Sequence, residues 1–117
     1  MIVSLEELEK ALLPNYAILV SGGFDPLHYG HVRYIKVAAE WAWDYDRPVV
    51  VAVAPDSYIA WKHPVLQDIE ARMEMIDALR WVDFVVPQGE ETAASVIRAC
   101  KPYIFLKGDD WKQRGLP

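Results

Sequence analysis

The stretch that decides the expected fold is Ser21-Gly22-Gly23-Phe24-Asp25-Pro26-Leu27-His28-Tyr29-Gly30-His31. It follows the apolar run 16–20, which predicts a strand, and it precedes a helical pattern that begins near residue 31. A strand, a glycine-bearing loop and a helix form a common anion site of α/β proteins. Glycine lets the backbone approach a ligand closely, and the start of a helix offers unpaired N–H groups with a favourable dipole.

The two histidines of this loop are three residues apart, so both rings can face one bound group if the turn between them is helical. Two other interpretations are a surface turn that happens to contain histidines and a metal site built on a histidine pair. A metal site needs a third protein ligand, and the sequence offers only Asp25 or the distant His63. The glycines and the strand–loop–helix context favour a phosphate site.

Residues 23–31 also resemble the G-x-F-D-x-x-H-x-G-H signature of the nucleotidyltransferase superfamily with its His-x-Gly-His site. In that family the two histidines lie against the phosphates of a nucleoside triphosphate. The resemblance therefore implies catalytic roles for His28 and His31. It also implies that the loop residues Gly23, Phe24, Asp25 and Gly30 bind the nucleotide.

The rest of the chain alternates helical and apolar patterns. We expect helices over 4–13, 31–43, 68–81 and 92–100 and strands over 16–20, 49–54, 84–86 and 103–106. The strand patterns lack polar alternation, which is typical of strands covered on both faces. The sequence thus predicts a single-domain α/β fold with a Rossmann-like, doubly wound parallel sheet, comprising an N-terminal helix in 1–15 and a nucleotide-binding domain over 16–117.

In such sheets ligands bind beyond the carboxyl ends of the strands, where the strand order reverses. The segments 22–31, 55–63 and 107–111 all follow predicted strands, so we expect them to meet at that edge. The N-terminal helix has the capping-box pattern of Ser4 and Glu7, and packing onto the sheet is favoured over a partner-binding arm. The aromatics Trp41, Trp43 and Tyr45 fit either the edge of the core or a subunit contact.

Arg72 falls on the apolar side of the helix predicted over 68–81, with Ile69, Met73 and Ile76. A charge there must reach a partner or snorkel to the edge of the core, and the residues alone do not decide between these. The pair Glu70-Ala71-Arg72 and Trp81-Val82-Asp83 resembles the family's E-x-R and V-D block. That resemblance implies that Arg72 helps to position a phosphate group.

Two further segments carry candidate ligand-binding residues. Lys62 lies in a predicted polar loop after the second strand, where a lysine is usually just solvated. The resemblance implies that it reaches the triphosphate or the acceptor phosphate. Lys107-Gly108-Asp109-Asp110-Trp111 could be an ordinary turn, but it resembles a motif of glycerol-3-phosphate cytidylyltransferases, whereas ADP-heptose-type enzymes tend to show a K-G-G-D-Y version. This implies nucleotide-binding roles for Lys107, Asp110 and Trp111.

Composition excludes several other classes of protein. The net charge of −5 argues against nonspecific nucleic-acid binding, which needs a basic face. No apolar run approaches the ~20 residues that a membrane-spanning helix needs, and the first residues lack the basic region of a signal peptide. The single cysteine, Cys100, allows no internal disulfide and is expected to be a buried, inert thiol. These features predict a cytoplasmic protein without a membrane or nucleic-acid partner.

The resemblance implies transfer of CMP from CTP to a small phosphorylated acceptor such as glycerol 3-phosphate, with Mg²⁺ escorting the triphosphate and no metal site made by the protein alone. An alternative is an adenylyltransferase that uses ATP with a sugar phosphate, pantetheine phosphate or a nicotinamide-type mononucleotide. Members of the family often form dimers, so a homodimer is also considered. The family's last strand and its I-S-T-T-like helix start have no counterpart in this sequence, and we expect the fold to lack them. A nucleotide-binding module without turnover is therefore a third interpretation.

Overall fold

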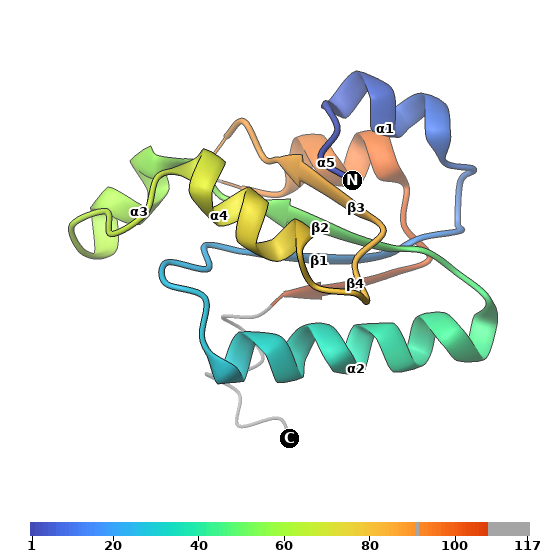
Figure 1. Cartoon of the computed structure of the whole chain (residues 1–117). Coiled ribbons are helices and arrows are strands. Elements are labelled where there is room, and N and C mark those ends of the chain that lie inside the picture. Colours follow the sequence, from blue (N-terminus) through green and yellow to red (C-terminus); the bar gives the residue numbers. More distant parts are fainter. Residues whose placement is uncertain (91, 108–117) are drawn as a thin grey trace.

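A computed structural model describes residues 1–90 and 92–107 of the chain. Its centre is a parallel sheet of β1 (Ile18–Gly22), β2 (Val49–Val53), β3 (Phe84–Pro87) and β4 (Ile104–Lys107), shown in Figure 1. The strand order is β3-β2-β1-β4. The chain moves outward from β1 to β2 and β3 and then returns to place β4 on the other side of β1. The strand order therefore reverses between β1 and β4, and this is where a doubly wound sheet binds its ligands.

The two inner strands differ in how well the sequence predicted them. β2 is buried at all its positions, as its uniformly apolar sequence predicts. β1 begins two residues later than predicted and continues through Ser21 and Gly22, which pair with Ala52 and Val53 of β2. A polar residue and a glycine do not end this strand, because β2 pairs with both residues and β4 pairs with Ser21.

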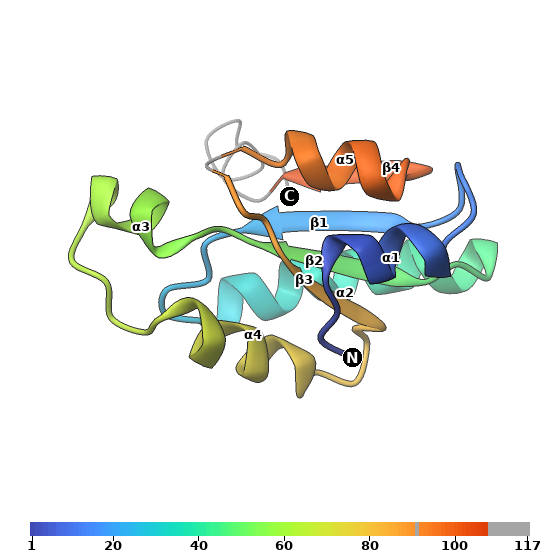
Figure 2. The same ribbon diagram turned by 90° about the horizontal axis from the view of Figure 1, so that it is seen from above.

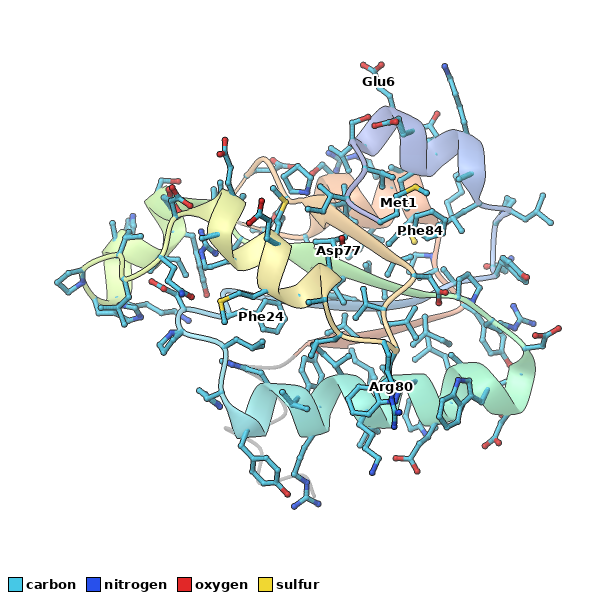
Figure 3. All side chains as sticks on the ribbon, in the orientation of Figure 1. Met1, Glu6, Phe24, Asp77, Arg80 and Phe84 are labelled. Carbon is cyan, nitrogen blue, oxygen red and sulfur yellow. The ribbon has the colours of Figure 1, made fainter. Side chains whose placement is uncertain are left out.

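Helices cover both faces of the sheet (Figures 1 and 2). On one face α2 (Tyr29–Tyr45) and α4 (Ile69–Asp77) enclose a core that includes Phe24, which Figure 3 labels. On the other face α1 (Leu5–Ala11) and α5 (Ala94–Cys100) enclose a second, smaller core. The predicted doubly wound architecture is confirmed. None of the helices among residues 1–90 and 92–107 is both long and apolar enough to cross a membrane.

The N-terminal helix packs onto the sheet. Leu8 of α1 is fully buried in the second core, and Ser4 and Glu7 form the predicted capping box. The hydrogen bonds from Ser4 to the Glu7 carboxylate lower the pKa of Glu7 below its ordinary value. The ammonium of Met1 pairs with Asp77 at the end of α4 (Figure 3). Residues 1–15 are therefore an integral layer of this fold.

The predicted helix boundaries differ most in α2 and α4. α2 begins at Tyr29, two residues before the predicted start, because the His28 side chain acts as its N-cap. α4 ends at Asp77 rather than at residue 81, and residues 78–81 form turns that lead into β3. At the end of α2, Trp43 is 69% exposed and Tyr45 is 54% exposed, so these aromatics lie on the surface rather than in the core.

The sequence predicts a polar loop over 61–65, around Lys62, and this prediction is wrong at its start. The residues before His63 form the short helix α3 (Asp56–Lys62), which follows β2 directly and protrudes beyond the carboxyl edge of the sheet (Figure 2). Its N-cap, Pro55, makes no side-chain hydrogen bond, so α3 lacks the capping-box signal that marks α1. Lys62 is consequently the last residue of a helix.

Candidate active site

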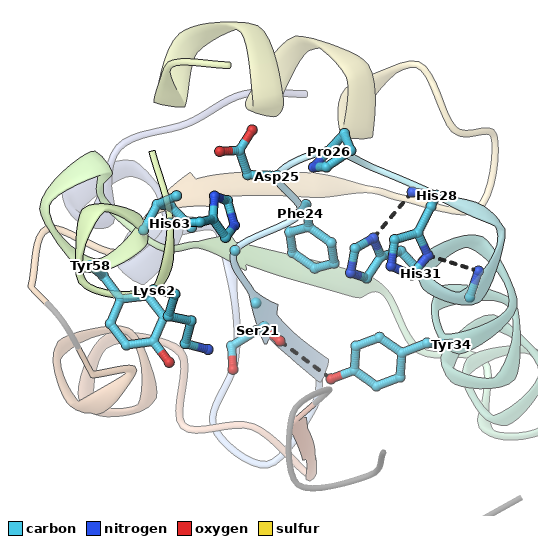
Figure 4. Close-up of a pocket in the computed structure, with 14 residues that line it drawn as sticks. Ser21, Phe24, Asp25, Pro26, His28, His31, Tyr34, Tyr58, Lys62 and His63 are labelled. Atoms are coloured by element: carbon cyan, nitrogen blue, oxygen red, sulfur yellow. Dashed lines mark hydrogen bonds between the residues drawn. The ribbon is translucent and has the colours of Figure 1, made fainter. Parts of the chain in front are cut away.

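A cleft of about 380 Å³ opens at the carboxyl ends of the strands, between the β1–α2 loop, the start of α2 and helix α3 (Figure 4). The segments 22–31 and 55–63 meet there, as predicted. The lining residues are Ser21, Gly22, Gly23, Phe24, Asp25, Pro26, His28, Gly30, His31, Tyr34, Tyr58, Ile59, Lys62 and His63.

The two histidines stand side by side at the start of α2 and line the cleft. Their ring centroids are 3.7 Å apart and the rings are nearly parallel, at 21°. The Nδ1 atom of His28 accepts a hydrogen bond from the backbone N–H of Gly30 at 3.1 Å. The Nδ1 atom of His31 accepts one from the backbone N–H of His28 at 3.2 Å (Figure 4). The two imidazoles therefore lie against one another and face the same cleft.

Phe24 and Gly23 shape the loop beneath the histidines. Phe24 is almost fully buried, and its ring meets the His31 ring edge-on at a centroid distance of 5.1 Å. A Cβ atom at position 23 would lie only 2.6 Å from Cδ1 of Ile59 on α3, so any larger residue there would displace the α3 side chain. These two predicted nucleotide-binding residues line the cleft and also fix its shape.

Asp25 faces the cleft, yet its carboxylate is engaged by the protein. Its two oxygens accept hydrogen bonds from the backbone N–H groups of Leu66 at 2.9 Å and Gln67 at 2.8 Å. Asp25 thus ties the β1–α2 loop to the segment that leads from α3 into α4. The hydrogen bonds of Asp25 therefore connect two loops. Its role in nucleotide binding stays a prediction.

Arg72 lies behind the cleft and its residue is only 1% exposed. Its guanidinium donates to the carbonyl oxygens of Gln67 at 3.0 Å, Gly23 at 2.7 Å and Ala54 at 2.8 Å. It also pairs with the carboxylate of Asp56 at 2.6 Å. Arg72 is therefore paired inside the protein and does not extend to the surface. These hydrogen bonds use four of its five N–H donors. The predicted phosphate contact of Arg72 remains a prediction.

The third wall of the cleft comes from α3. Lys62 ends this helix and lines the cleft, with its Nζ atom 4.7 Å from the centroid of the Tyr58 ring. His63 lines the same wall, and its Nδ1 atom lies 2.8 Å from the carbonyl oxygen of Pro64. Of the lysine and arginine side chains that the structure describes, Lys62 lines the cleft, whereas Arg72 is buried behind it.

Sequence reasoning missed several residues of the cleft. Tyr34 lies one helical turn after His31, and its hydroxyl donates to the carbonyl oxygens of Leu106 on β4 and, more distantly, Ser21 on β1. The spacing of three residues from His31 was a usable signal for Tyr34. Tyr58 and Ile59 carried no such signal, because α3 itself was not predicted.

A second hollow of about 440 Å³ adjoins the cleft across the end of β1, on the face of the sheet that carries α5. The two hollows share Ser21, Gly22 and Tyr58. The second one is mostly apolar, with Gln88 and Thr92 as its polar side chains besides those shared residues. The site therefore has one compartment lined by imidazoles and an adjoining compartment that is mostly apolar.

Other predicted site residues lie elsewhere. Lys107 ends β4 and pairs with Ser21 across the point where the strand order reverses, while Asp110 and Trp111 lie outside the described residues. Within residues 1–90 and 92–107, no three His, Cys, Asp or Glu side chains are grouped to hold a metal ion. Cys100, the last residue of α5, is 1% exposed, and burial raises the pKa of its thiol to about 11. It is not among the residues that line the cleft.

Comparisons with known proteins agree with this geometry. Residues 19–114 match the family model described as cytidylyltransferase-like. The chain is 36% identical over 116 residues to the bifunctional protein HldE of Coxiella burnetii, in an alignment that covers 89% of this chain and 24% of that protein. It is 40% identical over 98 residues to the bifunctional protein HldE of Gluconobacter oxydans, covering 82% of this chain and 20% of that protein. The chain thus spans a quarter or less of the length of these curated relatives.

A solved structure shares the fold. The lipopolysaccharide core biosynthesis protein of Thermoplasma volcanium superposes with a TM-score of 0.66 at 28% identity, covering 77% of this chain and 71% of that one. The family model spans most of the sheet and every element that lines the cleft. The chain therefore belongs to the cytidylyltransferase-like family of nucleotidyltransferases.

Proposed function

We propose that this chain transfers a nucleoside monophosphate from a nucleoside triphosphate to a small phosphorylated polyol or sugar and releases pyrophosphate. The observation that carries the proposal is the pair of stacked imidazoles, 3.7 Å apart, on the wall of a cleft at the reversal of strand order. Together with the start of a helix, such a pair suits the several negative oxygens of a triphosphate.

The reaction needs positioning more than covalent chemistry from the protein. A phosphate oxygen of the acceptor attacks the α-phosphorus, the bond from that phosphorus to the bridging oxygen breaks, and pyrophosphate leaves with the electron pair. His28, His31 and Lys62 line the cleft where they would donate to phosphate oxygens and stabilise the charge that develops there. Mg²⁺ bound to the triphosphate would neutralise further charge. Its ligands would come mainly from the substrate, because both oxygens of Asp25 already accept backbone hydrogen bonds.

The two adjoining hollows suit two substrates. We place the triphosphate in the cleft with the histidines and the acceptor in the hollow beside α5. The shared residues Ser21, Gly22 and Tyr58 would then lie where the two substrates meet. This arrangement supports direct transfer between bound substrates.

Two choices of substrates have specific support. The segment 107–111 resembles the motif of glycerol-3-phosphate cytidylyltransferases, which favours CTP with glycerol 3-phosphate. The similarity to the bifunctional HldE proteins, together with that to a lipopolysaccharide core biosynthesis protein, favours ATP with a sugar phosphate. A module that binds a nucleotide without turning it over is the third candidate.

The test is acceptor-dependent release of pyrophosphate, measured with CTP and with ATP, each paired with glycerol 3-phosphate and with a panel of sugar phosphates. We expect one combination to be turned over and His28→Ala to lower its rate by about 10²–10³-fold, the usual cost of losing one such donor. Circular dichroism should show the variant folded, because His28 is exposed. Calorimetric binding of a nucleotide without turnover of any acceptor would favour the non-catalytic module. Turnover by His28→Ala at the wild-type rate would overturn the assignment of the site.

A further inference from the structure

Helix α3 has one buried side chain. Of its seven residues, all of which the structure describes, Ile59 alone is buried, at 3% exposed, and the helix protrudes beyond the sheet (Figure 2). Trp61 on the same helix is 82% exposed. Isolated helices of this length are not stable in water, so packing against the body of the protein must hold α3 in place. The position of this helix therefore depends on Ile59.

The side chain of Ile59 occupies a notch that Gly23 leaves open in the β1–α2 loop. A Cβ atom at position 23 would lie 2.6 Å from Cδ1 of Ile59, which is closer than two carbon atoms can approach without one of them moving. Any residue other than glycine would therefore need the space that Ile59 fills. The missing side chain at position 23 is what lets α3 pack directly on the loop.

Arg72 holds the two sides of this contact next to each other. Its guanidinium donates to the carbonyl oxygen of Gly23 at 2.7 Å and to that of Ala54, the residue after β2, at 2.8 Å. It also pairs with Asp56, the first residue of α3. Arg72 thus fixes where α3 begins, and the packing of Ile59 fixes how close the rest of the helix lies to the loop.

Lys62 follows Ile59 by three residues, which is almost one helical turn. It lines the cleft on the wall across from His28 and His31 (Figure 4). We propose that Ile59, seated against Gly23, is a positioning residue that holds Lys62 at the distance from the histidines that a triphosphate needs. The ligand in this inference rests on the proposed function, whereas the seating of α3 rests on packing alone.

Amide hydrogen exchange measured without nucleotide tests the seating of α3. In Ile59→Ala the amides of α3 should exchange about tenfold faster, because the helix loses its buried side chain. The amides of the fully buried strand β2 are the internal reference for loss of the whole fold. Trp61→Ala, which removes a larger but exposed side chain from the same helix, is the control and should leave the rates unchanged. Unchanged α3 rates in Ile59→Ala would overturn the proposal.

The notch is tested by moving one methyl group across the contact. Gly23→Ala should speed exchange in α3 and weaken triphosphate binding, because its Cβ takes the place of Cδ1 of Ile59. Gly23→Ala/Ile59→Val adds that methyl group and removes Cδ1, so the packed volume is conserved and most of both losses should be recovered. Wild-type behaviour of Gly23→Ala, or no recovery in the double variant, would refute the role of the notch.

A double-mutant cycle measures whether Ile59 acts through Lys62. Calorimetry with CTP or ATP and Mg²⁺ should show that Ile59→Ala and Lys62→Met each weaken triphosphate binding by about tenfold. The combined variant should bind no more weakly than either single variant, because an unseated helix has already lost the contact of the lysine. Additive weakening of about a hundredfold would show that the two residues act independently and would overturn the positioning role.

The two kinds of measurement fail separately. Exchange rates report the seating of α3 whether or not the chain binds a nucleotide. No binding of either nucleotide by the wild-type chain would overturn the proposed function and the link to Lys62, and the exchange rates would still decide whether Ile59 seats the helix.

Discussion

Two cations near the cleft, Lys62 and Arg72, have similar predicted roles, but Lys62 is exposed and Arg72 is buried. Lys62 ends a short helix on the wall of the cleft and is exposed. Arg72 belongs to α4, has a side chain with no exposed surface, and gives its donors to three backbone carbonyls and Asp56. The same contrast separates His28 and His31, which face the cleft, from Asp25, whose carboxylate holds a neighbouring loop.

The difference shows that polar residues at this site have two separate tasks. One group lines the cleft and is placed to contact a ligand, and the other joins the loops that form the cleft. The segment 66–67 illustrates the second task, since Asp25 accepts the N–H groups of Leu66 and Gln67 and Arg72 donates to the carbonyl oxygen of Gln67. Substitutions in the two groups should therefore differ in what they damage.

The largest effect on stability is expected from Arg72→Leu. The change leaves three carbonyl oxygens and Asp56 without their partner, and we expect it to lower the free energy of unfolding by about 3 kcal/mol. Urea unfolding followed by circular dichroism measures the loss. The control is Arg98→Leu, which removes a 73% exposed side chain and should cost much less. An unchanged unfolding free energy together with weaker triphosphate binding would assign Arg72 to the ligand instead.

A smaller loss is expected from Asp25→Asn. The amide has one oxygen to accept two backbone N–H groups, so one of them loses its partner, at a cost of about 2 kcal/mol in unfolding free energy. The same chemical change at the exposed Asp44 on α2 is the control. Equal unfolding free energies for the two variants would show that Asp25 does not brace the loop.

The smallest effect is expected from Lys62→Met, and it should fall on binding. Loss of one charged donor should weaken triphosphate binding by about tenfold, or ~1.5 kcal/mol, with the melting temperature unchanged. Titration calorimetry with each nucleotide and Mg²⁺ measures this. Lys10→Met, on α1 and outside the residues that line the cleft, is the matched control and should bind as wild type does. Wild-type affinity in Lys62→Met would remove this lysine from the site.

The sequence predicted the layers of the fold because its signals were long or repeated. The apolar runs of β1 and β2 and the alternation with helices were enough for a doubly wound parallel sheet. Two local features, helix α3 and the start of α2, were not predicted. α3 has seven residues without a side-chain cap, and the start of α2 was missed because histidine is not a usual capping residue.

The candidate site was predictable where a motif marked it. The loop 22–31 indicated the histidines and the glycines, and the structure brings them together with Lys62. What Asp25 and Arg72 contact could not be predicted, because their partners are backbone groups of segments far away in the sequence, such as Gln67 for Asp25 and Gly23 for Arg72. A residue type at a given position does not reveal whether its polar atoms face a ligand or a carbonyl.

The most direct test of nucleotide binding by the paired imidazoles follows the ring Nε2 signals of His28 and His31 while the protein is titrated with Mg²⁺ and CTP or ATP. If the paired imidazoles hold the triphosphate, both signals shift together and saturate at the nucleotide concentration at which calorimetry shows saturation. Saturable binding that leaves both signals unmoved, or no binding of either nucleotide, would contradict the claim that paired imidazoles hold the triphosphate.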